Sequence, residues 1–262
     1  MAPEPTPAYD FALQVERLYA ALMVAAGSGP EPSLGGKLLY AGKLDGQGRA
    51  LLVAGNVAGA ASLAAADDGA QKQAIRDGVA DFLVTSLDEA LRILKNEIRK
   101  GETVAVCVAA GPEAIEREML ERGVLPDLLA ANLLGGAAFL RQGARRIEPC
   151  DRKEEQVLLR WSVASAPALW LPKLDAMALD CLGPEDRAAH RWLRLAPRYL
   201  GRLAQGRRVL TCAPESARKF VARVQLGVKR GEIGVEVRFS LDSHEETNLP
   251  WSSPPGNLRD EG

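Results

Sequence analysis

The sequence has only two histidines, His190 and His244, which leaves little material for a His-based metal centre or a histidine-activated nucleophile. No apolar run reaches the roughly 18 residues that a membrane helix needs, and the first residues do not resemble a secretion signal. We therefore expect a soluble, cytoplasmic protein without membrane contact. The cysteines lie tens of residues apart without a CxxC pair, so we expect buried thiols rather than disulfides or a zinc site. They are Cys107, Cys150, Cys181 and Cys212.

The chain also lacks an excess of charge of either sign, since its formal net charge is −1. This balance disfavours nucleic acid as a partner. The basic residues are nevertheless concentrated between His190 and Arg230, where Glu215 is the only acid. Five arginines at spacings of 4, 3, 4 and 4 predict a helix with the guanidinium groups along one face. This face suits a groove that binds anions, such as phosphates or nucleic acid, or an acidic partner. The alternative is a solvated face whose arginines pair with nearby acids. The arginines are Arg187, Arg191, Arg194, Arg198 and Arg202.

With 262 residues, 47% of them hydrophobic, the chain is long enough to bury a substantial core. Apolar residues at spacings of 3 and 4 predict a helix over 10–26. A strand is expected from Lys37, and the alanine-rich stretch that follows predicts a tightly packed helix and a second strand over 61–65. Helical character resumes over 71–79, and a strand is predicted over 81–85.

The segment SLDEALRILKNEIRKG carries the plainest helix pattern. Ser86 and Glu89 form a capping box, and Gly101 ends the helix. The valine-rich run TVAVCVAAG that follows is typical of a parallel strand covered on both faces. Alternation of strands and helices continues beyond it. The sequence therefore predicts an α/β fold, a doubly wound Rossmann-like parallel sheet with helices on both faces.

The expected organisation has five segments. Residues 1–35 are a loose start and a helix, 36–132 form the first part of the Rossmann domain, and 133–183 are an irregular insert. Residues 184–241 resume the helix and strand pattern and are expected to add strands to the same sheet. Residues 242–262 are acidic and poor in apolar side chains, which predicts a disordered tail.

Two blocks of sequence are similar to one known family. GGKLLYAG, LLVAGNVAGAASL, TSLDEALRIL and LERGVLPDLL resemble the NAD-binding, Rossmann-like domain of urocanase (urocanate hydratase). Later in the chain, HRWLRLAPRYL, RRVLTCAPESARKFV and VKRGEIGVEVRFSLD resemble the later part of the same domain. The two blocks occur in the family's order, which favours common ancestry.

The resemblance implies NAD as a cofactor, bound at a glycine-rich turn before a helix. Gly42, Gly46 and Gly48 are the candidate phosphate-binding residues, or they only form a tight turn between strand and helix. Asp67 is the candidate for the ribose hydroxyls, or it begins a helix. Other expected contacts are replaced, with Gly111 and Pro112 standing where the family has Asn-Ala.

The family's catalytic regions have no counterpart here, so we assign no catalytic residue and no metal ligand. The leading hypothesis is a stand-alone, divergent urocanase-like domain, a pseudoenzyme that binds a nucleotide or another anionic small molecule. One alternative is a protein-interaction module that uses the arginine-bearing helix, and a homodimer or another protein partner is compatible with either. The other alternative is a hydratase or lyase of altered chemistry, or one completed by a partner chain. Whether the chain is an enzyme stays open.

Overall fold

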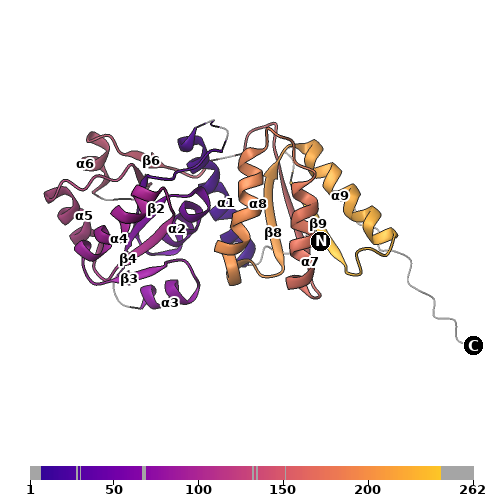
Figure 1. Ribbon diagram of the computed structural model, residues 1–262, viewed down its shortest axis with the longest axis horizontal. Helices are drawn as coiled ribbons and strands as arrows, with labels where there is room; N and C mark the ends of the chain where they lie inside the picture. The colour runs from indigo at the N-terminus through magenta and orange to yellow at the C-terminus, as the bar shows by residue number, and fades with distance from the viewer. Residues whose placement is uncertain are drawn as a thin grey trace, which may run out of the picture. The chain divides into compact units, whose positions relative to one another are not determined.

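The computed structural model describes residues 7–27, 29, 31–66, 69–131, 133, 135–150 and 152–242, apart from the side chains of 7–10, 203 and 204. The chain forms two compact units (Figure 1). The larger unit comprises Met1–Arg152 and Arg187–Gln205, and the smaller unit comprises Lys153–Asp186 and Gly206–Gly262. None of the helices in the described residues combines the length and apolar character that crossing a membrane requires.

The larger unit is built on a six-stranded sheet in which every neighbouring pair of strands is parallel. Helices cover both faces of this sheet, so the predicted α/β, Rossmann-like doubly wound fold is confirmed. The strand order is β3-β4-β2-β1-β5-β6. The strands are β1 (Leu38–Lys43), β2 (Ala61–Ala65), β3 (Phe82–Val84), β4 (Val104–Val108), β5 (Leu128–Ala130) and β6 (Arg145–Ile147).

One face of the sheet is covered by α2 (Gly46–Ala58), which lies against β1 and β2. Helices α1 (Pro7–Ala26) and α8 (Arg187–Leu200) pack on α2, and the 3-10 turn η1 (Gly201–Ala204) follows α8. All of α2 from Ala50 to Ala58 is buried, because the strands cover one side of the helix and α1 and α8 cover the other. A Cβ on Gly55 would lie only 2.7 Å from Ser62 Oγ.

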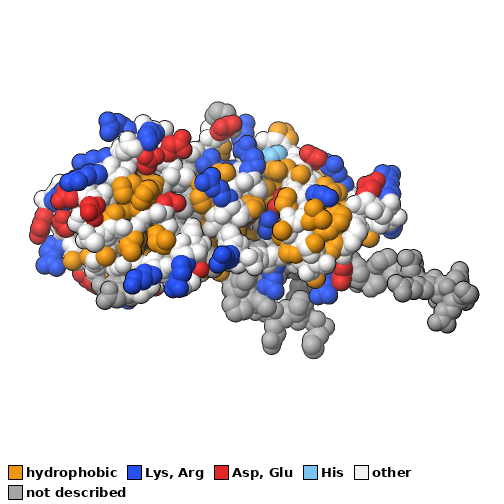
Figure 2. Space-filling view, turned by 60° about the horizontal axis from the view of Figure 1, so that its bottom comes forward, with side chains coloured by type: hydrophobic (Ala, Val, Ile, Leu, Met, Phe, Trp, Pro, Cys, Tyr) orange, Lys and Arg blue, Asp and Glu red, His pale blue; other side chains and the backbone are white. Residues whose placement is uncertain are grey.

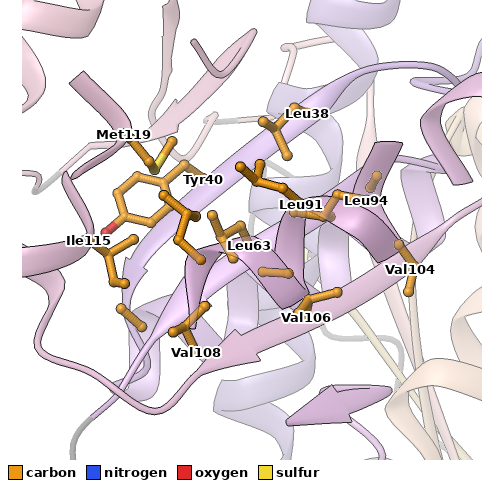
Figure 3. Close-up of a cluster of buried hydrophobic side chains, with 14 of the residues drawn as sticks. Leu38, Tyr40, Leu63, Leu91, Leu94, Val104, Val106, Val108, Ile115 and Met119 are labelled. Carbon is orange, nitrogen blue, oxygen red and sulfur yellow. The ribbon is translucent and has the colours of Figure 1, made fainter. Parts of the chain in front are cut away.

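The opposite face is covered by α4 (Leu87–Lys100) and α5 (Pro112–Glu121). Figure 3 shows their apolar side chains packed on those of the strands, with Tyr40 beside Ile115 and Met119. Helices α3 (Ala70–Arg76) and α6 (Gly136–Arg141) are shorter.

The predicted ends of α4 are confirmed. Ser86 Oγ accepts a hydrogen bond from the Glu89 amide at 3.3 Å, and Gly101 ends the helix with φ of +72°. The capping box and the terminal glycine therefore set the length of this helix.

The smaller unit contains a separate three-stranded antiparallel sheet in the order β8-β7-β9. Helices α7 and α9 pack on β7 and on each other. The rings of Trp161, Phe220 and Phe239 meet edge to face in its core, with centroids 5.1 and 5.7 Å apart. The elements are β7 (Val157–Val163), α7 (Pro167–Leu179), β8 (Arg207–Cys212), α9 (Pro214–Lys229) and β9 (Val237–Asp242).

The predicted segment boundaries are wrong in the second half of the chain. Residues 184–241 add no strand to the parallel sheet, because β8 and β9 pair with β7 from the predicted insert 133–183. That insert is not irregular, since it contains α6, β6, β7 and α7. The physical reason lies in the strands: β9 alternates apolar and polar residues, as a strand with one solvated face does, whereas β4 is buried throughout. Of the predicted tail 242–262, Asp242 is the last residue of β9, and residues 243–262 lie outside the described residues.

A buried ion pair in the smaller unit makes its stability depend on pH. Asp175 on α7 accepts from Arg208 Nε on β8, at 2.9 Å to Oδ2, and both side chains are nearly buried. Burial raises the pKa of Asp175 to about 6, although Arg208 lowers it. The folded protein therefore binds the Asp175 proton more tightly than the unfolded chain does, and this contribution to stability is lost as pH rises through about 6.

We expect the unfolding free energy to fall by up to about 3 kcal/mol from this group between about pH 4 and about pH 6. In Asp175→Asn this component disappears, because the amide does not titrate. Denaturant unfolding followed by tryptophan fluorescence at several pH values measures the slope. Asp180→Asn is the matched control, since Asp180 pairs with Arg223 at an exposed position. Equal slopes in wild type and Asp175→Asn would contradict the prediction.

Candidate functional site

The chain reverses its direction of travel across the parallel sheet between β1 and β5. From β1 it passes to β2 and β4 on one side, and it returns to the other side of β1 at β5. Ligands of open α/β sheets bind at the carboxyl ends of the strands at such a point. A cavity of about 170 Å³ lies there in the larger unit. Its lining residues are Ala41, Gly42, Lys43, Asp45, Gln47, Gly48, Pro112, Glu113, Glu116, Ala130 and Leu133.

The turn from β1 to α2 brings two of the predicted residues into the cavity wall. Gly42 has φ of +69°, a backbone conformation that favours glycine, and it follows an irregularity in the pairing of β1 with β2. A Cβ on Gly48 would lie 2.0 Å from the Lys43 carbonyl oxygen, so the first turn of α2 packs directly on the strand. Gly46 does not line the cavity, and a Cβ there would meet nothing within 4 Å. Asp67, the predicted ribose ligand, lies outside the described residues.

The N-terminus of α2 already carries a carboxylate. Asp45 is its N-cap, and Asp45 Oδ1 accepts hydrogen bonds from the amides of Gln47 at 3.0 Å and Gly48 at 2.9 Å. These amides are the donors that would hold a pyrophosphate at the start of the helix. The aspartate therefore takes the position and the sign of charge of the phosphate.

A second acidic group comes from α5, which begins opposite this turn. Glu116 is 7% exposed, and its Oε2 accepts from the Gly135 amide at 3.1 Å. Burial raises the pKa of the Glu116 carboxyl, and the nearby Glu113 raises it further. Tyr40 on β1 donates to the Pro112 carbonyl at 3.4 Å and hydrogen-bonds with Glu116; burial raises its pKa.

Sequence reasoning missed Glu116 and Tyr40. Glu116 lies between Ile115 and Met119, which both face the core. A charged residue within the apolar face of a predicted helix was the available sequence signal for it. Tyr40 gave no comparable indication, because an aromatic residue is ordinary in a buried strand.

The residues of this cavity do not fit a dinucleotide held in the usual way. The two amides at the start of α2 are bonded to Asp45, and the carboxylates of Glu113 and Glu116 face the same space. A pyrophosphate at the start of α2 would therefore meet occupied amides and like charges.

Four of the five predicted arginines lie on α8, whereas Arg202 lies in η1 beyond the end of the helix, and two of the guanidinium groups bond within the larger unit. Arg191 Nε donates to the Val57 carbonyl at 2.7 Å in the last turn of α2, where a cation is stabilised by the helix dipole. Arg187 Nη1 donates to the Gly29 carbonyl at 2.8 Å. Arg194, Arg198 and Arg202 are exposed. A single groove formed by all five guanidinium groups is therefore not observed.

The histidines and cysteines form no alternative site in the part of the chain that the structure describes. No group of three or more His, Cys, Asp or Glu residues in that part is arranged to hold a metal ion. Cys107 is buried in β4, where burial raises the pKa of its thiol to about 11. No model of a known protein family matches the sequence.

The close packing of Gly48 on β1 generates a paired prediction. Gly48→Ala should lower the unfolding free energy by roughly 1–3 kcal/mol or more, because the new methyl group would overlap a backbone oxygen that cannot move away cheaply. Gly46→Ala, two residues earlier in the same helix, should be neutral or slightly stabilising, since the space is open. Chemical denaturation followed by circular dichroism measures both. Equal effects of the two substitutions would show that the close approach is not as described.

Proposed function

We propose that this chain is a divergent, urocanase-like Rossmann-domain protein that binds a small organic cation at the carboxyl ends of β1 and β5, and is no urocanate hydratase by itself. The observation that carries the proposal is the Asp45 carboxylate bonded to the amides of Gln47 and Gly48. It supports a positively charged ligand, whereas the sequence led us to expect a nucleotide or another anion.

The charges around the cavity support a cation. Asp45, Glu113 and Glu116 face it, against the single base Lys43; Glu116 is buried, whereas the other three residues are exposed. A phosphate or carboxylate entering this space would meet three like charges, whereas a protonated amine would form charge-assisted hydrogen bonds with them. Glu116 is the most buried of these groups, so its interaction with a cation is the least screened by solvent.

The size of the cavity supports a small ligand. At about 170 Å³ the cavity lies below the roughly 300–1,000 Å³ of pockets for drug-sized ligands, which favours a ligand of few heavy atoms. A short aliphatic amine meets both the size and the charge. The apolar side chains of Ala130 and Leu133 complete the wall and suit its methylene groups.

For urocanase-like ancestry, the larger unit supplies features common to Rossmann-like domains: the sheet reverses its strand order beside β1, and Gly42 and Gly48 keep the backbone roles of a Rossmann turn. The segments RRVLTCAPESARKFV and VKRGEIGVEVRFSLD lie in the antiparallel smaller unit, so the proposed ancestry rests on the first block of resemblance. No residue in the cavity is assigned a catalytic role. Sustained hydration of urocanate by the purified chain would contradict this part of the proposal.

Three probes of equal chain length test the ligand class. We expect 1,4-diaminobutane to raise the melting temperature, 1,4-butanediol to do so less, and succinate not at all, because only the first pairs with the carboxylates. NAD, NADH and ATP should leave melting unchanged. Thermal melting at low ionic strength, followed by calorimetric titration, measures the order. A larger shift with NAD or succinate than with the diamine would overturn the proposal.

Glu116→Gln should weaken binding of the diamine by roughly tenfold or more, because a desolvated charge partner is lost. Glu118→Gln is the matched control on the same helix, since Glu118 is exposed and pairs with Arg122. Affinity should also rise with pH as Glu116 ionises, over a range displaced upward from the usual glutamate value of 4.5. If both variants bind equally, Glu116 has no role in the site.

A further inference from the structure

A second cavity in the larger unit adjoins the first one at the start of α2. Its volume is about 410 Å³, and its walls come from α1, from the first turn of α2 and from the segment that follows β6. We call it the α1 cavity, and we call the cavity that contains Asp45, Glu113 and Glu116 the acidic cavity. The α1 cavity is lined by Leu13, Gln14, Arg17, Gln47 and Pro149.

The α1 cavity lies at the same edge of the parallel sheet as the acidic cavity. β6 pairs in parallel with β5, and β5 pairs in parallel with β1, so the carboxyl ends of all three strands are at one edge. Pro149 comes shortly after the end of β6, and the amide of Cys150 donates to the Arg17 carbonyl at 3.4 Å. This bond holds the segment after β6 against α1. Both cavities therefore belong to the edge at which open α/β sheets bind their ligands.

Gln47 connects the two cavities. Among the residues that the structure describes, it lines both of them, and it is half-buried. Its backbone amide donates to Asp45 Oδ1 at 3.0 Å, which fixes its position at the start of α2. A glutamine side chain carries both donors and an acceptor, so it can contact the cationic and the anionic part of one ligand. A molecule too long for the acidic cavity can extend past Gln47 into the α1 cavity.

The two cavities differ in the sign of their charge. The acidic cavity has three carboxylates against Lys43, whereas Arg17 is the only charged residue among the described residues that line the α1 cavity. Leu13 and Gln14 precede Arg17 by four and three positions on α1, so the three side chains share one side of the helix. One wall of the α1 cavity therefore combines a cation with an amide and an apolar group.

The distribution of charge over the surface favours a small ligand. Figure 2 shows acidic and basic side chains interspersed on one face of the molecule, without a broad area of one sign. The formal net charge of the chain is −1. Such a surface attracts neither a polyanion nor a polycation over long distances. The separation of charge between two adjoining cavities instead suits a molecule that carries one charge of each sign.

We propose that the ligand is an ω-amino carboxylate, with its ammonium group in the acidic cavity and its carboxylate at Arg17. This assignment rests on the proposed function, which places the ammonium group. The carboxylate and the guanidinium form charge-assisted hydrogen bonds, and Leu13 offers an apolar contact for the methylene chain. Because the cavities meet at Gln47, an α-amino acid, whose two charged groups share one carbon, is too short to reach both.

Three probes of equal chain length test the anionic end: 6-aminohexanoate, hexylamine and 1,6-diaminohexane. We expect calorimetric titration at low ionic strength to show that 6-aminohexanoate binds roughly threefold or more tightly than hexylamine, since an ion pair with an exposed arginine contributes modestly. The diamine should bind more weakly than 6-aminohexanoate, because its second ammonium group would meet Arg17. Glycine should bind no better than methylamine, because its two charges are too close together.

Arg17→Glu should reverse this order, so that 1,6-diaminohexane binds more tightly than 6-aminohexanoate, because the carboxylate would then meet a like charge. A general loss of structure would weaken all probes and would not reverse their order. Arg99→Glu is the matched control, since Arg99 is exposed in the last turn of α4 and the substitution changes the net charge equally. It should leave the order as in the wild type.

The outcomes separate the two proposals. If hexylamine and 6-aminohexanoate bind equally well, the anionic end is wrong and the cation site stands. If 6-aminohexanoate keeps its advantage in Arg17→Glu, its carboxylate lies elsewhere and the assignment to Arg17 is overturned. If none of the amines binds, the proposed function fails, and the ω-amino carboxylate fails with it.

Discussion

The larger unit depends on how closely α2 approaches β1 and β2. At Gly48 the helix rests on the Lys43 carbonyl, and at Gly55 it rests on Leu39 and Ser62, where any side chain on either glycine would intrude. This contact fixes the start of α2 against the end of β1 and so shapes one wall of the cavity. Helices α1 and α8 pack on the other side of α2, so the helix is buried between them and the sheet. Gly48, a candidate phosphate-binding residue, thus has a packing role that is independent of any ligand.

Asp45 separates the fold from the chemistry usually associated with it. A Rossmann turn offers the amides at the start of a helix to a bound anion. Here the side-chain carboxylate of the N-cap residue, Asp45, occupies those amides. With the helix dipole already balanced by a carboxylate, the remaining acids of α5 determine the potential in the cavity. One residue at the cap therefore decides whether these amides are free for an anion or already bonded within the chain. The glycine pattern alone does not reveal this, because it describes only the backbone.

The sequence predicted the larger unit well where local patterns and tertiary structure agree. The cap at Ser86, the end at Gly101 and the buried valine run of β4 all follow from residues within one element. The second sheet was not predicted, because pairing of β7 with β8 joins segments separated by two helices and local periodicity does not specify strand partners. For the cavity, the resemblance to urocanase pointed to the glycine-rich turn, of which Gly42 and Gly48 line the wall and Gly46 does not. Glu116 was not, because its importance comes from burial, which the sequence only suggests.

The path of the chain between the two units has a consequence for folding. After Arg152 the chain enters the smaller unit, returns to the larger unit for α8, and goes back for β8. Neither unit is therefore one continuous segment. A fragment that ends at Arg152 would lack α8, and with it the hydrogen bond from Arg191 to the Val57 carbonyl of α2. It would also lack the ring of Trp192, whose centroid lies 5.1 Å from that of Tyr19. When α8 docks, it shortens the free loop between β7 and β8 and lowers the entropy that their pairing must overcome. The connectivity thus couples the helical layer of the parallel sheet to the pairing of β7 with β8 through the length of loop that remains free.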